Sequence, residues 1–159
     1  MKKKLEKNIE IGALIVTSLL LVKFIPRNKI REAHVSFLFK QVLTWLFGLL
    51  VVEKKLIKYP HRLLFRKSTK SSFTFEYFVY PALCSLFNVH YPEKRNSIIK
   101  LLYYLFYSSI ITGFELFAAK YTKLIKYEKW TWYWSLITMW ITYYLSRVYY
   151  RWFFGNQDQ

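Results

Sequence analysis

Residues 130–150 have the sequence WTWYWSLITMWITYYLSRVYY, an apolar segment with aromatic rings at both ends. Trp130, Trp132 and Trp134 open the segment, and tyrosines close it. In an α-helix, which rises about 1.5 Å per residue, the two groups of rings would lie about 30 Å apart. This spacing matches the hydrocarbon core of a bilayer, and Trp and Tyr are enriched at both membrane interfaces. The segment therefore predicts a transmembrane helix.

Four further apolar blocks precede this segment, separated by basic connections. We expect helices over residues 9–25, 33–52, 73–88, 98–119 and 130–150. Apolar residues make up 54% of the 159-residue chain and aromatic residues 21%, which is more than one small soluble core can bury. The predicted fold is therefore all-α, a single membrane domain over residues 1–159 with about five transmembrane helices.

The charge is strongly positive, with 25 Lys and Arg against 9 Asp and Glu. The basic residues lie mostly between the apolar blocks, and no segment is typical of a soluble nucleic-acid-binding fold, so nucleic acid is not an expected partner. Fifteen basic residues fall on the side of the N-terminus and nine on the opposite side. The positive-inside rule then predicts a cytoplasmic N-terminus and an external C-terminus.

Lys40, Glu76, Glu115 and Arg147 are charged residues that lie inside the last four apolar blocks. Charged side chains inside a bilayer are costly, so we expect all four to face protein or water. Because successive helices alternate in direction, the carboxylates fall in the cytoplasmic half and the cations in the outer half. The axial offset, roughly 10–20 Å at 1.5 Å per residue, argues against pairs between Lys40 and Glu76 or between Glu115 and Arg147.

Two carboxylates at one depth repel each other unless one takes up a proton or a cation lies between them. Arg62, in the basic connection before Glu76, is the cation we expect to clamp both carboxylates. The alternatives are a proton or cation site, or glutamates that simply reach the interface. Two basic connections, which include Arg62, Arg66, Lys120 and Lys123, also predict contacts with anionic lipid headgroups on the cytoplasmic side.

Small polar residues recur at helical spacing within the apolar blocks, for example Ser135, Thr138 and Thr142. Such stripes allow membrane helices to pack closely and form hydrogen bonds. A packing seam is the expected interpretation, and a hydrated pathway along the same stripe is the alternative.

The sequence contains no catalytic constellation. There is no HExxH, GxSxG or Gly-rich phosphate loop, and the single Cys84 excludes an internal disulfide or a multi-cysteine metal site. We therefore expect no enzyme activity, no cofactor and no metal. The predicted function is a small non-enzymatic membrane protein that packs with lipid, with a second copy or with a partner membrane protein. The alternative is a minimal proton- or cation-coupled transporter or channel that uses Glu76 and Glu115.

Several short motifs occur together in residues 26–154. They are Pro26-Arg27-Asn28-Lys29, Thr44-Trp45, Tyr59-Pro60-His61-Arg62-Leu63, Phe75-Glu76-Tyr77, Tyr80-Pro81, Tyr91-Pro92, Glu115 and Tyr121-Thr122-Lys123-Leu124-Ile125, followed by Trp130 and Trp132. On these motifs the chain resembles an uncharacterised family of small multi-pass membrane proteins common in endospore-forming Gram-positive bacteria. The resemblance implies a bacterial plasma membrane or spore membrane location and implies no activity.

Overall fold

The computed structural model describes residues 2–65, 67 and 70–155. Within these residues the fold is all-helical, which confirms the predicted class. The α-helices are α1 Lys2–Phe24, α2 Ile30–Glu53, α3 Tyr80–Val89, α4 Ser97–Tyr121 and α5 Trp132–Phe154. The shorter elements are a 3-10 turn η1 at Arg27–Lys29, strand β1 at Ile57–Lys58, a π-helix η2 at Thr74–Val79 and strand β2 at Lys126–Tyr127.

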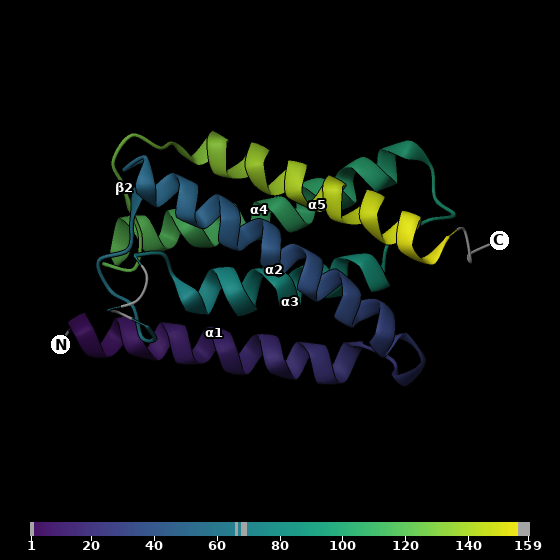
Figure 1. Cartoon of the computed structure of the whole chain (residues 1–159), viewed down its shortest axis with the longest axis horizontal. Helices are drawn as coiled ribbons and strands as arrows, with labels where there is room; N and C mark the ends of the chain where they lie inside the picture. Colours follow the sequence, from purple (N-terminus) through teal and green to yellow (C-terminus); the bar gives the residue numbers. More distant parts are fainter. Residues whose placement is uncertain (1, 66, 68–69, 156–159) are drawn as a thin grey trace.

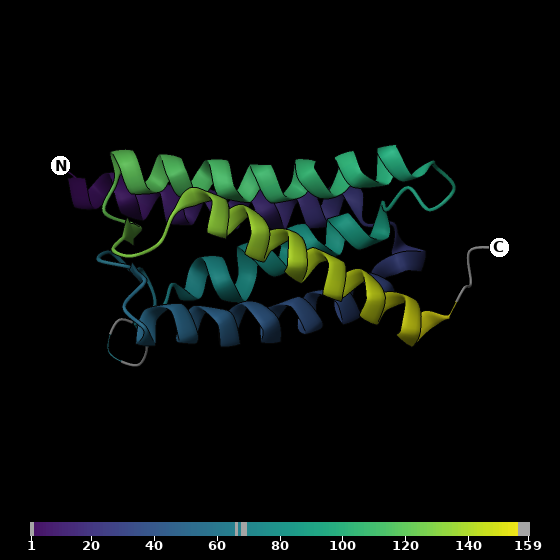
Figure 2. The ribbon, with the colours of Figure 1, turned by 90° about the horizontal axis from the view of Figure 1, so that it is seen from above.

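The long helices alternate in direction along one bundle axis (Figure 1). The N-terminus and the connections after α2 and α4 lie at one end, which we call the N-terminal end. The turn after α1, the connection after α3 and the end of α5 lie at the other, the C-terminal end. Both views separate the two termini in this way (Figures 1 and 2). The bundle thus gathers the connections into the two sets that the sequence predicted.

The centre of the bundle is α3. Eight of its ten residues are buried, and it contacts all four other α-helices. The ring of Phe87 is fully buried and has five tyrosine rings within 5.5 Å of it, centroid to centroid. A helix that is apolar on every side must be enclosed by others, which explains this central position.

The third predicted helix begins as a π-helix instead of a single regular α-helix, and Pro81 leaves one carbonyl of this π-helix without a backbone donor. In a π-helix each carbonyl pairs with the amide five residues later, and for Glu76 that residue is Pro81, which has no N–H. The Glu76 carbonyl instead accepts a hydrogen bond from Thr44 Oγ1 at 2.5 Å, and the Tyr77 carbonyl accepts one from Gln41 Nε2 at 2.8 Å. Side chains of α2 therefore replace the missing backbone donor and fix η2 against α2.

The outer helices bury polar faces and expose apolar ones. The buried residues of α2 are Ala33, Ser36, Lys40, Thr44 and Gly48. The buried polar residues of α4 and α5 are Ser108, Thr112, Glu115, Ser135, Thr142, Ser146 and Arg147. The opposite faces expose large apolar side chains, such as Leu46 at 47% and Phe106 at 59%. A protein in water buries apolar side chains and exposes polar ones. The opposite pattern in these helices therefore suits apolar surroundings.

Two helical segments, Arg27–Glu53 and Ser97–Tyr121, are long and apolar enough to cross a bilayer. Only 22% and 33% of their most apolar windows are buried, which distinguishes them from the enclosed core helix of a soluble domain. The first half of α1 is charged, and α5 is rich in Trp and Tyr. The third helical segment consists of η2, with 6 residues, and α3, with 10. Length and apolarity thus support two of the five predicted spans.

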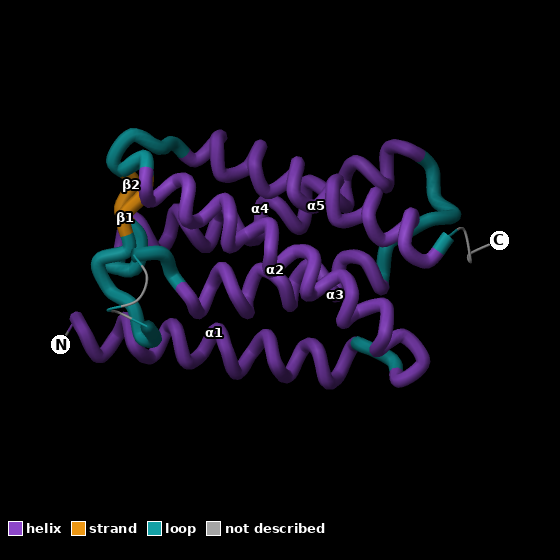
Figure 3. Tube along the Cα trace, viewed as in Figure 1, coloured by secondary structure: helices purple, strands orange, loops and turns teal. Residues whose placement is uncertain are grey.

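A short antiparallel sheet joins the two connections at the N-terminal end (Figure 3). Ile57 of β1 pairs with Tyr127 of β2, and the Leu56 carbonyl accepts a hydrogen bond from the Glu128 amide at 3.0 Å. We call residues 56–59 together with 124–128 the β-cap. Ile57 and Tyr59 are both buried, so the β-cap closes this end of the bundle.

Candidate functional site

A partly open cavity of about 70 Å³ lies between α2, η2, α4 and α5, beneath the β-cap. A water molecule needs about 10–15 Å³ of such space, so the cavity has room for several waters. Its polar lining residues are Thr44, Tyr59, Glu76, Tyr80, Glu115, Ser135, Thr138 and Thr142. Among the described residues, two carboxylates line the cavity and no Lys, Arg or His does. The structure therefore brings Glu76 and Glu115 to one cavity whose described lining contains no basic side chain.

Glu76 is the less satisfied of the two carboxylates. Its side chain is 3% exposed, and neither carboxylate oxygen has a hydrogen-bond partner of normal geometry. The hydroxyls of Tyr59 and Ser71 are polar neighbours of the carboxylate. On the other side the carboxylate lies against Gly48 of α2, so closely that a Cβ at residue 48 would overlap it. A buried, ionised carboxylate in this setting is costly until a proton or a cation neutralises it.

Glu115 of α4 is better supported. It accepts hydrogen bonds from Tyr80 Oη at 2.9 Å and from Tyr127 Oη at 3.1 Å. The Tyr127 hydroxyl also lies 3.2 Å from Ser135 Oγ, which accepts a hydrogen bond from Trp130 Nε1 at 2.9 Å. Both donors to Glu115 are neutral, so its charge is not compensated. Because Tyr127 belongs to β2, the position of this carboxylate depends on the β-cap.

The predicted cation Lys40 lies next to the cavity but not in it. Its side chain is fully buried, donates a hydrogen bond to Thr142 Oγ1, and lies 4.3 Å from the ring centroid of Tyr143. Thr142 also lines the cavity, so this hydroxyl connects the two polar regions. Among the described residues Lys40 forms no ion pair with Glu76, in agreement with the depth argument.

Arg147, the other predicted cation, lies at the C-terminal end of the bundle. It forms an ion pair with Glu93 and donates a hydrogen bond to the Asn88 carbonyl at 3.4 Å. Its guanidinium carbon also lies 4.3 Å from the ring centroid of Tyr91 and 4.7 Å from that of Tyr150. The four predicted charges are thus distributed over three places: the carboxylates share the cavity, and the two cations have other partners.

The described contacts of Arg62 do not include the predicted clamp on the two carboxylates. The Arg62 Nη1 donates hydrogen bonds to the carbonyls of Tyr59 and Lys70, at 3.0 and 3.1 Å, and no described ion pair joins it to Glu76 or Glu115. The reason is that the polypeptide around Arg62 folds back on itself and presents its own carbonyls to the guanidinium.

The three other basic residues of the predicted clamp and lipid contacts have separate positions. Arg66 lies outside the described residues. Lys120 is exposed, and its Nζ lies 5.3 Å from the ring centroid of Tyr121. Lys123 contributes its backbone, because its carbonyl accepts a hydrogen bond from the His61 amide at 3.0 Å.

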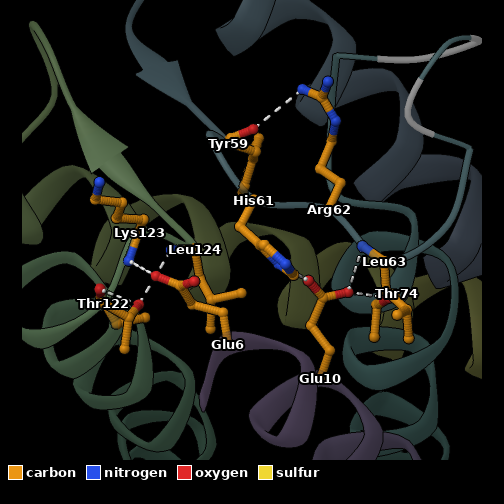
Figure 4. A network of polar contacts seen from close by, with 11 residues as sticks. Glu6, Glu10, Tyr59, His61, Arg62, Leu63, Thr74, Thr122, Lys123 and Leu124 are labelled. Atoms are coloured by element: carbon orange, nitrogen blue, oxygen red, sulfur yellow. Dashed lines mark hydrogen bonds and ion pairs between the residues drawn. The ribbon is translucent and has the colours of Figure 1, made fainter. Parts of the chain in front are cut away.

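A buried glutamate of α1 holds the connection after α2 (Figure 4). Glu10 is 1% exposed and accepts hydrogen bonds from the Leu63 amide at 3.0 Å and from Thr74 Oγ1 at 2.9 Å. Its other oxygen lies 3.1 Å from His61 Nδ1, an ion pair whenever that ring is protonated. Glu10 therefore fastens the connection after α2 to α1.

A second glutamate of α1 holds the connection after α4. Glu6 is 2% exposed and accepts a hydrogen bond from the Lys123 amide at 2.9 Å (Figure 4). The sequence analysis named neither glutamate, because Glu6 lies in the basic stretch before the predicted helix over residues 9–25 and Glu10 lies at the start of that helix. The available signal was their spacing, since Glu6 and Glu10 are four residues apart and share one helix face.

Within the described part of the chain, no group of three or more His, Cys, Asp or Glu side chains is arranged to hold a metal ion. No protein-family model, curated protein or solved structure matches the chain. The function proposed below therefore rests on the cavity and its two carboxylates.

Proposed function

We propose that this chain is a non-enzymatic protein that crosses a bacterial plasma membrane five times. The inverted helix faces support this proposal, as do the two long apolar segments with largely exposed surfaces. The bias of 15 basic residues against 9 supports a cytoplasmic N-terminal end. In this orientation the cavity lies toward the cytoplasmic side, beneath the β-cap.

In this setting the cavity binds an exchangeable cation, either a proton or a small metal cation. The observation that carries the proposal is Glu76, a buried carboxylate whose polar neighbours, the Tyr59 and Ser71 hydroxyls, are neutral and which faces a space large enough for water. Glu115 supplies a second carboxylate, and the neighbouring hydroxyls supply further oxygen ligands. Hard cations prefer such oxygen ligands, and a proton satisfies the same pair by joining one carboxylate.

The surroundings of the cavity suggest a direction of exchange. Ile57, Tyr59 and Trp130 separate it from the N-terminal end, and Thr142 separates it from Lys40. A positive charge at Lys40 repels a second cation and therefore opposes the onward passage of a metal ion. Exchange through the β-cap therefore avoids the positive charge of Lys40.

The test is flux across liposomes that contain the purified protein. A pH-sensitive dye inside the vesicles reports protons, and arms with Na⁺, K⁺ or a large impermeant cation outside separate protons from metal cations. Glu76→Gln should abolish the flux, because an amide keeps the shape but neither binds an exchangeable proton nor compensates a cation. Glu53→Gln removes an exposed carboxylate of α2 and should leave the flux unchanged.

A packing protein with a dry polar seam is the second candidate. Two threonine hydroxyls favour it, because Thr138 and Thr142 donate to carbonyls of their own helix, at 2.8 and 2.9 Å. In that case vesicles with the wild type and with Glu76→Gln would show the same background leak. The Gln variant would also unfold at a higher temperature, since it removes a buried charge that no partner compensates.

A further inference from the structure

A groove of about 420 Å³ lies between the last turns of α1 and the first turns of α2. It exists because α1 packs against α3 and η2, and α3 lies between α1 and α2 over most of their length (Figure 1). The walls of the groove are apolar and include Leu21, Ile25 and Phe37. Val22 on its rim is 83% exposed, so no other part of the described chain covers the groove.

The mouth of the groove is basic. Arg27 and His34 line it, and Lys23 and Arg31 are exposed nearby in the sequence. Neither Arg27 nor Arg31 forms an ion pair among the described residues. The one acidic residue in this region, Glu32, already has partners, because it lies 3.6 Å from Lys29 and accepts a hydrogen bond from Tyr150. The local charge is therefore positive and uncompensated.

We propose that this groove binds one phospholipid with an anionic headgroup. An acyl chain would lie along Leu21, Ile25 and Phe37, and the phosphate would meet Arg27. A guanidinium suits this role because it donates to phosphate oxygens in a bidentate geometry. The groove also ends at η1, where the turn between two membrane helices would reach the headgroup region. The inference rests on the membrane location proposed above and is independent of the cation site.

The headgroup half of the proposal is tested with the full chain in a neutral detergent. Phosphatidylglycerol and phosphatidylcholine with identical acyl chains are added, and native mass spectrometry counts the lipid retained. We expect one phosphatidylglycerol per protein and weaker retention of phosphatidylcholine. Arg27→Gln should weaken phosphatidylglycerol binding about five-fold, the effect of one basic residue near an anionic lipid surface. Lys94→Gln removes an exposed charge from the same end of the bundle and should change binding less than two-fold. An equal loss in both variants would reject a specific site.

The acyl half is tested with a tryptophan that fills the groove. Val22→Trp places a large ring on the rim and should reduce phosphatidylglycerol binding, whereas Val16→Trp, on a differently directed exposed position of the same helix, should not. Equal binding by both variants would show that no chain enters the groove. Glycerol 3-phosphate at millimolar concentration should not compete, and competition would identify a free phosphate site instead. Because these measurements are made without a membrane gradient, lost lipid binding with intact cation flux rejects only the groove, and the reverse rejects only the cation site.

Discussion

At the scale of single residues, Gly48 and Glu76 form one unit. The carboxylate occupies the position at which any larger residue would place its Cβ. Gly113 offers a contrast within the same bundle, because a Cβ there would meet nothing within 4 Å. Alanine variants at the two positions can therefore distinguish a steric requirement for glycine at residue 48 from the general cost of glycine in a helix.

We predict that Gly48→Ala lowers the free energy of unfolding by about 1–3 kcal/mol, the usual cost of an overpacked interior. Gly113→Ala should instead raise it by up to about 1 kcal/mol, because alanine is the better helix former. Thermal or chemical unfolding in detergent measures both values. Adding Glu76→Ala should remove most of the Gly48→Ala penalty, and an unchanged penalty would show that the carboxylate is not the obstacle.

A second residue-scale prediction concerns Tyr59 in the connection after α2. Burial, and next the nearby Glu76 and Glu115, hold the pKa of this phenol well above its ordinary value of 10.0. Above pH 10 the unfolded chain releases the proton while the folded chain keeps it, so the stability contributed by Tyr59 is complete below pH 10 and is lost as the pH rises. Tyr59→Phe should therefore flatten the alkaline loss of stability. Tyr121→Phe, at a 63% exposed site, should follow the wild type in the same pH series of unfolding curves.

At the scale of elements, the π-helix η2 depends on α2. Pro81 leaves the Glu76 carbonyl without a backbone donor, and Thr44 replaces it. We predict that Thr44→Val costs about 1–3 kcal/mol, the penalty for a buried carbonyl that loses its partner. In a Pro81→Ala background the restored amide should reduce that cost. Unfolding of the two single variants and the double variant measures the coupling, and strictly additive costs would contradict this account of the π-helix.

The helices and the charges that interrupt them were predictable from local features, whereas the contacts between connections were not. A carboxylate such as Glu76 is conspicuous in an apolar block, and the aromatic ends of α5 mark a complete helix. By contrast, Glu10 accepts a hydrogen bond from an amide 53 residues away, and Glu6 accepts one from an amide 117 residues away. Both glutamates lie close to several lysines in the sequence, which gives no sign of these contacts. The contacts of Arg62 could not be predicted for the same reason. Only the folded connection shows that the guanidinium donates to backbone carbonyls.

At the scale of the whole molecule, the two ends of the bundle differ in charge and in structure. The N-terminal end carries the β-cap, the buried glutamates of α1 and most of the basic residues. We predict that a reporter placed in the connection after α2 behaves as cytoplasmic and that one fused after Gln159 behaves as extracytoplasmic. Phosphatase and fluorescent-protein fusions in a bacterial host measure both positions. Two reporters on the same side would reduce the number of spans to an even value, and exchanged sides would reverse the orientation.

The bonds made by α1 also set an order for assembly at the ribosome. The amide that Glu6 binds follows it by 117 residues, which is roughly 6–23 s of translation at about 5–20 residues per second. Until the Lys123 amide emerges, the Glu6 carboxylate depends on water for its hydrogen bonds, so the first turn of α1 has to remain hydrated. The first turn of α1 thus gains this bond only after most of the chain has been made. A nascent chain stalled before Lys123 would lack the bond to Glu6, a state that membrane quality-control proteases could distinguish from the finished protein.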